Sequence, residues 1–115
     1  MSRRILVVCD DLLFWARIRA AAESAGTTAV RISDAASLET ALAEGGIVRV
    51  LADLGSKSVD PLSLARRLRG LPEPPVLVAF GSHVDDDLLE DARLAGYDEV
   101  LPNSALHRRV AELTR

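Results

Sequence analysis

The amino-acid sequence predicts an α/β domain whose core is a sheet of five parallel strands. Two observations lead to this prediction. Continuous apolar runs of strand length recur at residues 5–9, 47–52 and 76–80, and segments whose apolar residues have helical spacing separate them. Continuous apolar runs, unlike alternating ones, are typical of strands that are covered on both faces. A regular succession of strand, helix and strand therefore favours a right-handed, doubly wound sheet.

Two weaker strands, at residues 28–32 and 98–101, bring the predicted number to five. The first helix carries an apolar stripe that starts at Phe14 and continues at spacings of three and four residues to Ala25. Gly26 is predicted to end this helix, because glycine adopts the left-handed conformation that commonly follows a C-terminus.

The other four helices are predicted mainly from their first residues. Asp34 is expected to cap the second helix, and Asp60 followed by Pro61 is expected to start the third. Aspartate accepts hydrogen bonds from the free amides of a first turn, and proline suits the first helical position. Three aspartates at residues 85–87 favour the start of a fourth helix, and the fifth is expected to begin near Ser104.

Composition narrows the classes of function. The chain has 115 residues and a formal net charge of -3, which suits one domain over residues 1–115. Only four residues are aromatic, and Lys57 is the sole lysine. We therefore expect neither a nucleic acid nor a membrane as partner, because both contacts favour a basic surface and single strands also need aromatic platforms. The short first apolar run fits no signal peptide, so a cytoplasmic location is expected.

Three carboxylates follow predicted strands and are candidates for one site. Asp10 and Asp11 come after the first strand, and Asp53 ends the third. In an open parallel sheet, ligands bind at the carboxyl ends of the strands, and magnesium prefers one or two carboxylates plus water. Asp10 or Asp11 could instead cap the first helix. Asp53 is not placed to cap a helix, so a functional origin is favoured for it.

Four segments resemble the receiver domain of bacterial response regulators. They are residues 5–11 (ILVVCDD), 51–54 (LADL), 64–68 (LARRL) and 95–99 (AGYDE). The resemblance covers essentially the whole chain and implies a three-layer, flavodoxin-like (βα)5 fold with strand order 2-1-3-4-5. It also implies that Asp53 accepts a phosphoryl group from a histidine kinase. The same resemblance makes Asp10 and Asp53 the magnesium ligands, with Asp11 as an alternative.

Three positions depart from the family pattern. Cys9 stands where the first magnesium-binding acid is expected, Phe80 where a threonine or serine ends the fourth strand, and Asn103 where a lysine ends the fifth. Phenylalanine has no hydroxyl and asparagine has no charge. Losing one charge-stabilising donor typically costs about 10²–10³ in rate, so these departures predict a degenerate phosphoryl switch and at most weak magnesium binding. Cys9 is expected to be a buried, unreactive residue.

A partner surface is implied by the same resemblance, because receivers usually signal through their fourth helix, fifth strand and fifth helix. In this sequence that surface would contain Arg93, Tyr97, Val100, His107 and Arg108. For Tyr97 we expect a loop residue whose ring packs on the surface, with a partner contact as the alternative. Trp15 lies beside the buried stripe of the first helix, where it would either contact a partner or pack at the edge of the core.

Three hypotheses for function follow. The first is a stand-alone, receiver-like signalling protein that acts through protein–protein contact, with a histidine kinase or a downstream effector as partner, and without the standard switch. The second is a true phosphoacceptor that binds magnesium through Asp10 and Asp53, assisted by Asp11 or Ser82. The third, a small-molecule-binding module, is the weakest, because no glycine-rich phosphate loop follows the first strand. No nucleophile has a histidine placed to serve it, so an enzyme is not expected.

Overall fold

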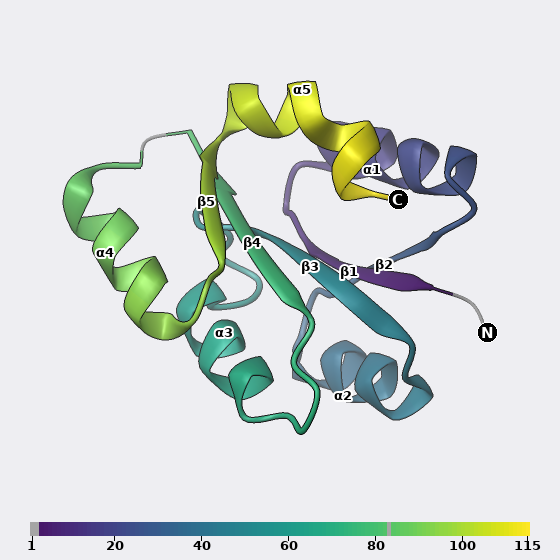
Figure 1. Cartoon of the computed structure of the whole chain (residues 1–115), viewed down its shortest axis with the longest axis horizontal. Helices are drawn as coiled ribbons and strands as arrows, with labels where there is room; N and C mark the ends of the chain where they lie inside the picture. The colour runs from purple at the N-terminus through teal and green to yellow at the C-terminus, as the bar shows by residue number, and fades with distance from the viewer. Residues whose placement is uncertain (1–2, 83) are drawn as a thin grey trace.

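The chain folds into a five-stranded parallel sheet that lies between two layers of helices (Figure 1). The computed structural model describes residues 3–82 and 84–115. Its strand order is β2-β1-β3-β4-β5, so the predicted α/β class and strand order are confirmed. The elements are β1 (Arg4–Val8), α1 (Leu12–Ser24), β2 (Thr28–Arg31), α2 (Ala35–Glu44), β3 (Ile47–Asp53), α3 (Pro61–Arg69), β4 (Val76–Gly81), α4 (Asp86–Ala95), β5 (Glu99–Pro102) and α5 (Asn103–Leu113).

The two faces of the sheet bury two separate apolar clusters, because successive side chains of a strand point to opposite faces. Val7 and Leu51 lie in the cluster under α1 and α5. Leu6 and Val50 lie in the cluster under α2, α3 and α4. All four are fully buried. This double cover explains why the central strands read as continuous apolar runs in the sequence.

The starts predicted for the second, third and fourth helices are confirmed by their capping contacts. Asp34 accepts a hydrogen bond from the Ser37 amide at 2.7 Å, and the Ser37 hydroxyl accepts one from the Asp34 amide at 3.2 Å. The two bonds form a capping box. Asp60 caps α3, which begins at proline, and Asp85 caps α4. Each aspartate satisfies amides that the first turn of a helix leaves without a partner.

The last strand lies one residue further along the chain than the sequence predicts. Asp98 precedes β5, and its carboxylate accepts a hydrogen bond from the Leu77 amide at 2.8 Å and pairs with Arg69. These contacts tie the segment before β5 to β4 and α3, so the strand begins at Glu99. The final helix follows directly and starts at Asn103, one residue before the predicted Ser104.

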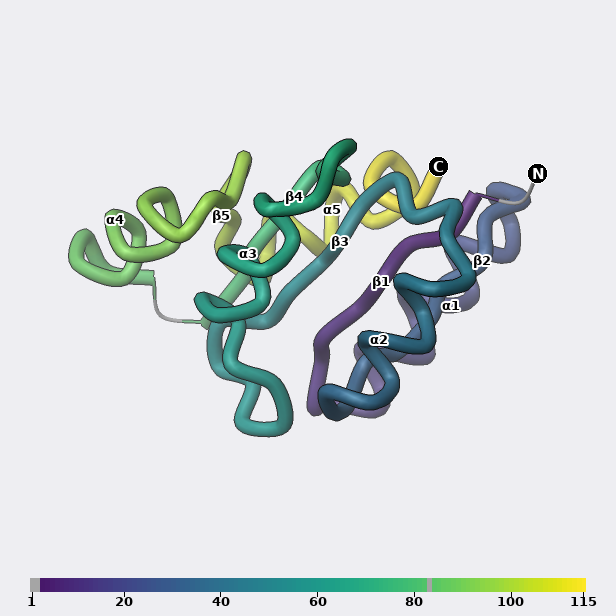
Figure 2. Tube along the Cα trace, turned by 90° about the horizontal axis from the view of Figure 1, so that it is seen from below, coloured from purple at the N-terminus to yellow at the C-terminus, as the bar shows by residue number. Residues whose placement is uncertain are grey.

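The carboxyl ends of β1 and β3 meet where the strand order reverses, which is the usual ligand position in this architecture. The loop between β3 and α3 projects beyond the sheet at this edge (Figure 2). In the described ranges, no helix has both the length and the apolar character needed to cross a membrane.

Candidate functional site at the carboxyl edge of the sheet

The three candidate carboxylates all lie at the carboxyl edge of the sheet, but they have different surroundings. Asp11 is the N-cap of α1, since its Oδ1 accepts hydrogen bonds from the amides of Leu13 at 2.9 Å and Phe14 at 3.2 Å. The capping role that the sequence allowed for either of two neighbours therefore belongs to Asp11. Its carboxylate is committed to the helix start.

Asp10 is exposed, and the loop between β3 and α3 supplies its hydrogen-bond donors. Its Oδ1 accepts from the hydroxyls of Ser56 at 3.0 Å and Ser58 at 2.6 Å, and its Oδ2 accepts from the Lys57 amide at 2.8 Å. These bonds, that from Ser58 foremost, lower the pKa of Asp10, because they favour the ionised carboxylate. Both oxygens of this side chain are thus already engaged by the chain itself.

Asp53 ends β3 and is half-buried. Its Oδ1 accepts a hydrogen bond from the Gly55 amide at 2.8 Å. Burial raises the pKa of Asp53, and the negative charges of Asp10 and Asp11 raise it further, while the Gly55 bond acts in the opposite direction. The ionised form of Asp53 is therefore less well stabilised than that of Asp10.

Cys9 is buried, as the sequence predicts, with 1% of its surface exposed. Its thiol donates to the Asp11 carbonyl oxygen at a sulfur–oxygen distance of 3.4 Å. Burial raises the pKa of the Cys9 thiol, and the nearby charges of Asp53, Asp11 and Asp10 add to this effect. At neutral pH the residue is a neutral thiol, which is a poor ligand for a hard cation such as magnesium.

Phe80 fills the space beside Asp53. The two residues are register partners in the pairing of β3 with β4, and Phe80 is fully buried. Its ring meets the Phe14 ring edge-on at a centroid distance of 5.3 Å, and Phe14 in turn stacks on His107 at 4.2 Å. We call these three side chains the aromatic cluster. It joins β4, α1 and α5 at the edge where Asp53 lies.

The remaining predicted positions contribute little polar chemistry. Asn103 is half-buried at the first position of α5, and its Oδ1 is a buried atom without a hydrogen-bond partner among the described residues. Ser82 is exposed just after β4. Lys57 is exposed, and its backbone amide donates the hydrogen bond to Asp10.

Contacts within the chain already engage most of the oxygens that a magnesium ion would use here. Within residues 3–82 and 84–115, no three His, Cys, Asp or Glu side chains are grouped so as to hold a metal ion. Magnesium needs free oxygen ligands in a near-octahedral arrangement. Here the Asp10 oxygens accept hydrogen bonds from the loop and Asp11 caps a helix.

The residues of the predicted partner surface differ in their exposure. Arg93 and Arg108 are exposed, whereas Val100, His107 and Trp15 are half-buried. Arg93 and Val100 line one small groove of about 220 Å³ along α4 and β5. Trp15 packs against the apolar cluster under α1 and α5, which is the core-edge position that the sequence allowed.

The expectation that the Tyr97 ring packs on the surface is wrong. Only 5% of Tyr97 is exposed, and its ring belongs to the apolar cluster under α2, α3 and α4. Its hydroxyl donates to the Pro61 carbonyl oxygen at 2.6 Å, which ties the segment after α4 to the start of α3. Burial raises the pKa of Tyr97. The hydroxyl finds a partner inside the protein, so the ring can be buried without leaving a polar group unsatisfied.

Sequence reasoning missed Ser56 and Ser58. Their hydroxyls reach Asp10 across 46 and 48 positions of the chain. The signal that could have found them is the Ser-Lys-Ser segment that follows Asp53, since short hydroxyl side chains in a loop are common donors to a nearby carboxylate.

Comparison with known proteins finds similar solved structures only. No family model and no curated protein matches the sequence. Among solved structures, the signal receiver domain of a response regulator from Bermanella marisrubri is 26% identical, with full coverage of both chains and a TM-score of 0.77. A response regulator from Thermotoga maritima is 21% identical over 97% of this chain and 99% of its own, with a TM-score of 0.73.

A third structure is the receiver domain of the sensor histidine kinase PA1611 from Pseudomonas aeruginosa, which holds a magnesium ion in its active-site cleft. It is 18% identical over 99% of this chain and 98% of its own, with a TM-score of 0.75. The resemblance that the sequence indicates is thereby confirmed: this chain is similar over its whole length to response regulator receiver domains, and it has their fold.

Proposed function

We propose that this chain is a receiver-like signalling domain that acts through protein–protein contact and without the standard phosphoryl switch. The receiver fold supports a role in two-component signalling. The observation on which the proposal depends is Phe80, whose buried ring occupies the position at the end of β4 where the family has a hydroxyl. A ring buried against Phe14 of α1 has no donor for a phosphoryl oxygen, and close packing restricts its movement.

Two further features support the proposal. Asn103 stands in the place of the family's lysine and brings no positive charge to balance a phosphoryl group on Asp53. Phosphoryl transfer depends mainly on positioning and on such charge stabilisation, so the missing charge should slow it. The aromatic cluster of Phe14, Phe80 and His107 also ties α1 and α5 to β4, which favours one fixed arrangement of this edge.

For the partner surface we propose the groove along α4 and β5, with Arg93 and Val100 in contact with a protein and the exposed Arg108 on α5 as a further contact. Exposed arginine beside half-buried apolar side chains is typical of protein interfaces. The partner is a histidine kinase or a downstream effector, and the domain works in the cytoplasm. No nucleic-acid or membrane contact belongs to this proposal, because the net charge of -3 does not favour either.

The second candidate function is a true phosphoacceptor, which is favoured by the position of Asp53. This carboxylate ends β3 at the strand-order reversal, and it is half-exposed. The Pseudomonas receiver domain, which has the same fold, holds magnesium in its cleft. In this candidate, Asp10 and Asp53 would be the ligands.

Intact mass after treatment with acetyl phosphate and magnesium separates the two candidates. We expect no stable addition of a phosphoryl group to the wild type. A receiver domain that carries the full set of acids, hydroxyl and lysine serves as the positive control in the same reaction. Addition of one phosphoryl group that Asp53→Asn abolishes would refute the proposal and establish the second candidate.

A further inference from the structure

The loop between β3 and α3 is fixed on two sides. On one side, Ser56, Lys57 and Ser58 donate hydrogen bonds to the carboxylate of Asp10 at 3.0, 2.8 and 2.6 Å. On the other side, Val59 packs against the apolar cluster under α2, α3 and α4. Consecutive residues thus contact the Asp10 carboxylate, which follows β1, and the core, so the loop is tied to two parts of the molecule at once.

The donors at Asp10 compete with a cation for the oxygens of this carboxylate. A bound magnesium ion takes lone pairs from its carboxylate ligand and keeps several of its own waters. Two hydroxyls and one amide already donate to the oxygens of Asp10, and the preceding side chain is the buried thiol of Cys9. Asp10 therefore contacts the loop with the same oxygens that it would need for a metal ion.

We propose that the Asp10 carboxylate is an intramolecular latch, which holds the loop between β3 and α3 closed through Ser56, Lys57 and Ser58 without a divalent cation. The inference rests on the proposed function and deepens it, because it describes how the loop beside the same site is held in one conformation. A carboxylate with neutral donors from its own chain replaces the carboxylate–cation pair.

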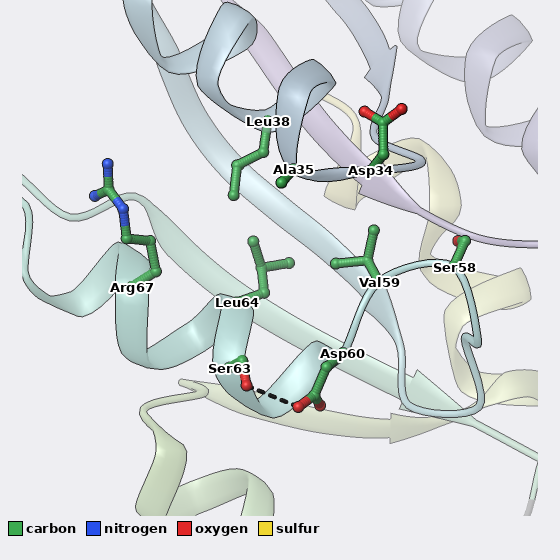
Figure 3. Close-up of a pocket in the computed structure, with 9 residues that line it drawn as sticks. All are labelled: Asp34, Ala35, Leu38, Ser58, Val59, Asp60, Ser63, Leu64 and Arg67. Atoms are coloured by element: carbon green, nitrogen blue, oxygen red, sulfur yellow. Dashed lines mark hydrogen bonds between the residues drawn. The ribbon is translucent and has the colours of Figure 1, made fainter.

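The latch also shapes a neighbouring groove. The groove between α2 and α3 has a volume of about 340 Å³, and Ser58 and Val59 belong to its lining. Figure 3 shows Val59 and Leu64 pointing into this groove from the loop and from α3. The latch holds Ser58 and the apolar cluster holds Val59, so the latch contributes to fixing this wall of the groove.

Amide hydrogen exchange of the loop measures the latch directly. Asp10→Ala removes the acceptor, and the double variant Ser56→Ala/Ser58→Ala removes two donors. We expect exchange of the loop amides, including that of Lys57 in the double variant, to become about tenfold faster, which corresponds to the loss of roughly one net hydrogen bond. Ser63→Ala is the matched control, because it removes a similar exposed bond to Asp60 at 2.7 Å. Glu23→Ala, on α1, controls for the loss of one negative charge that Asp10→Ala also causes.

A magnesium titration of the wild type, followed by the amide signals of Asp10 and Lys57, completes the test. We expect no saturable shift at millimolar magnesium. Saturable binding at these residues, or loop exchange that is the same in the latch variants and in Ser63→Ala, would overturn the latch. The two proposals fail separately. Magnesium binding in this titration removes only the latch, whereas phosphorylation of Asp53 in the separate acetyl phosphate experiment removes the proposed function.

Discussion

Asp10 and Asp53 lie at the ends of neighbouring strands on the same edge of the sheet, yet their surroundings shift their pKa values in opposite directions. Asp10 is exposed and accepts three hydrogen bonds from the loop, which lower its pKa. Asp53 is half-buried beside Phe80 and accepts one from Gly55, and burial raises its pKa. Donors within the chain stabilise a carboxylate charge, whereas loss of water destabilises it.

The two halves of this edge are also held together by different kinds of contact. The Asp10 half is a polar loop held by hydrogen bonds that water can replace. The Asp53 half is closed by the aromatic cluster of Phe14, Phe80 and His107. Packing in a core is sensitive to every missing atom, while exposed polar contacts contribute little net free energy. The apolar half should therefore contribute much more to stability than the loop half.

The largest effect is expected for Phe80→Ala. Removing a fully buried ring leaves a cavity between β4 and α1 and should lower the free energy of unfolding by about 3–5 kcal/mol. Urea denaturation measures this value. Leu13→Ala is the control, because Leu13 is 86% exposed and its loss should change stability by no more than about 0.5 kcal/mol. A cost below about 1 kcal/mol for Phe80→Ala would show that the ring is not packed as described.

A smaller effect is expected for Asp10→Asn. The variant keeps the shape of the side chain but loses the charge that strengthens the three donor contacts, so stability at neutral pH should fall by about 1 kcal/mol. The pKa of Asp10 is lowered in the folded state, and its contribution is therefore present above about pH 4 and is lost as the pH falls further. Urea curves at pH 7 and pH 3 test this: equal losses at both pH values would contradict the assignment.

Local signals account for most of what the sequence predicted. Apolar runs mark the strands, and pairs such as Asp60 and Pro61 mark helix starts, because both depend on residues a few positions apart. The missed details depend on contacts between distant segments. Tyr97 is buried because its hydroxyl reaches Pro61, and β5 starts one residue late because Asp98 is held by Leu77.

The candidate site divides in the same way. The positions of Asp10 and Asp53 at one edge follow from strand ends and parallel topology, so they were predictable. The contacts of Asp10 with Ser56 and Ser58 were not, since they depend on how a loop closes more than forty residues away. Sequence periodicity fixes where a strand ends, and it contains no information on which side chains a loop will bring to that end.

The smallest expected effect, Asp53→Asn, has the opposite sign to Asp10→Asn. Because burial raises the pKa of Asp53, its ionised form costs the folded state stability once the pH exceeds the unfolded value of about 4. Asparagine removes that cost and can still accept the Gly55 hydrogen bond, so stability at pH 7 should rise by less than about 1 kcal/mol. Both forms carry no charge at pH 3, where the gain should disappear. A loss of stability at pH 7 would mean that unrecognised partners stabilise the ionised Asp53 carboxylate, and the contrast with Asp10 would then be wrong.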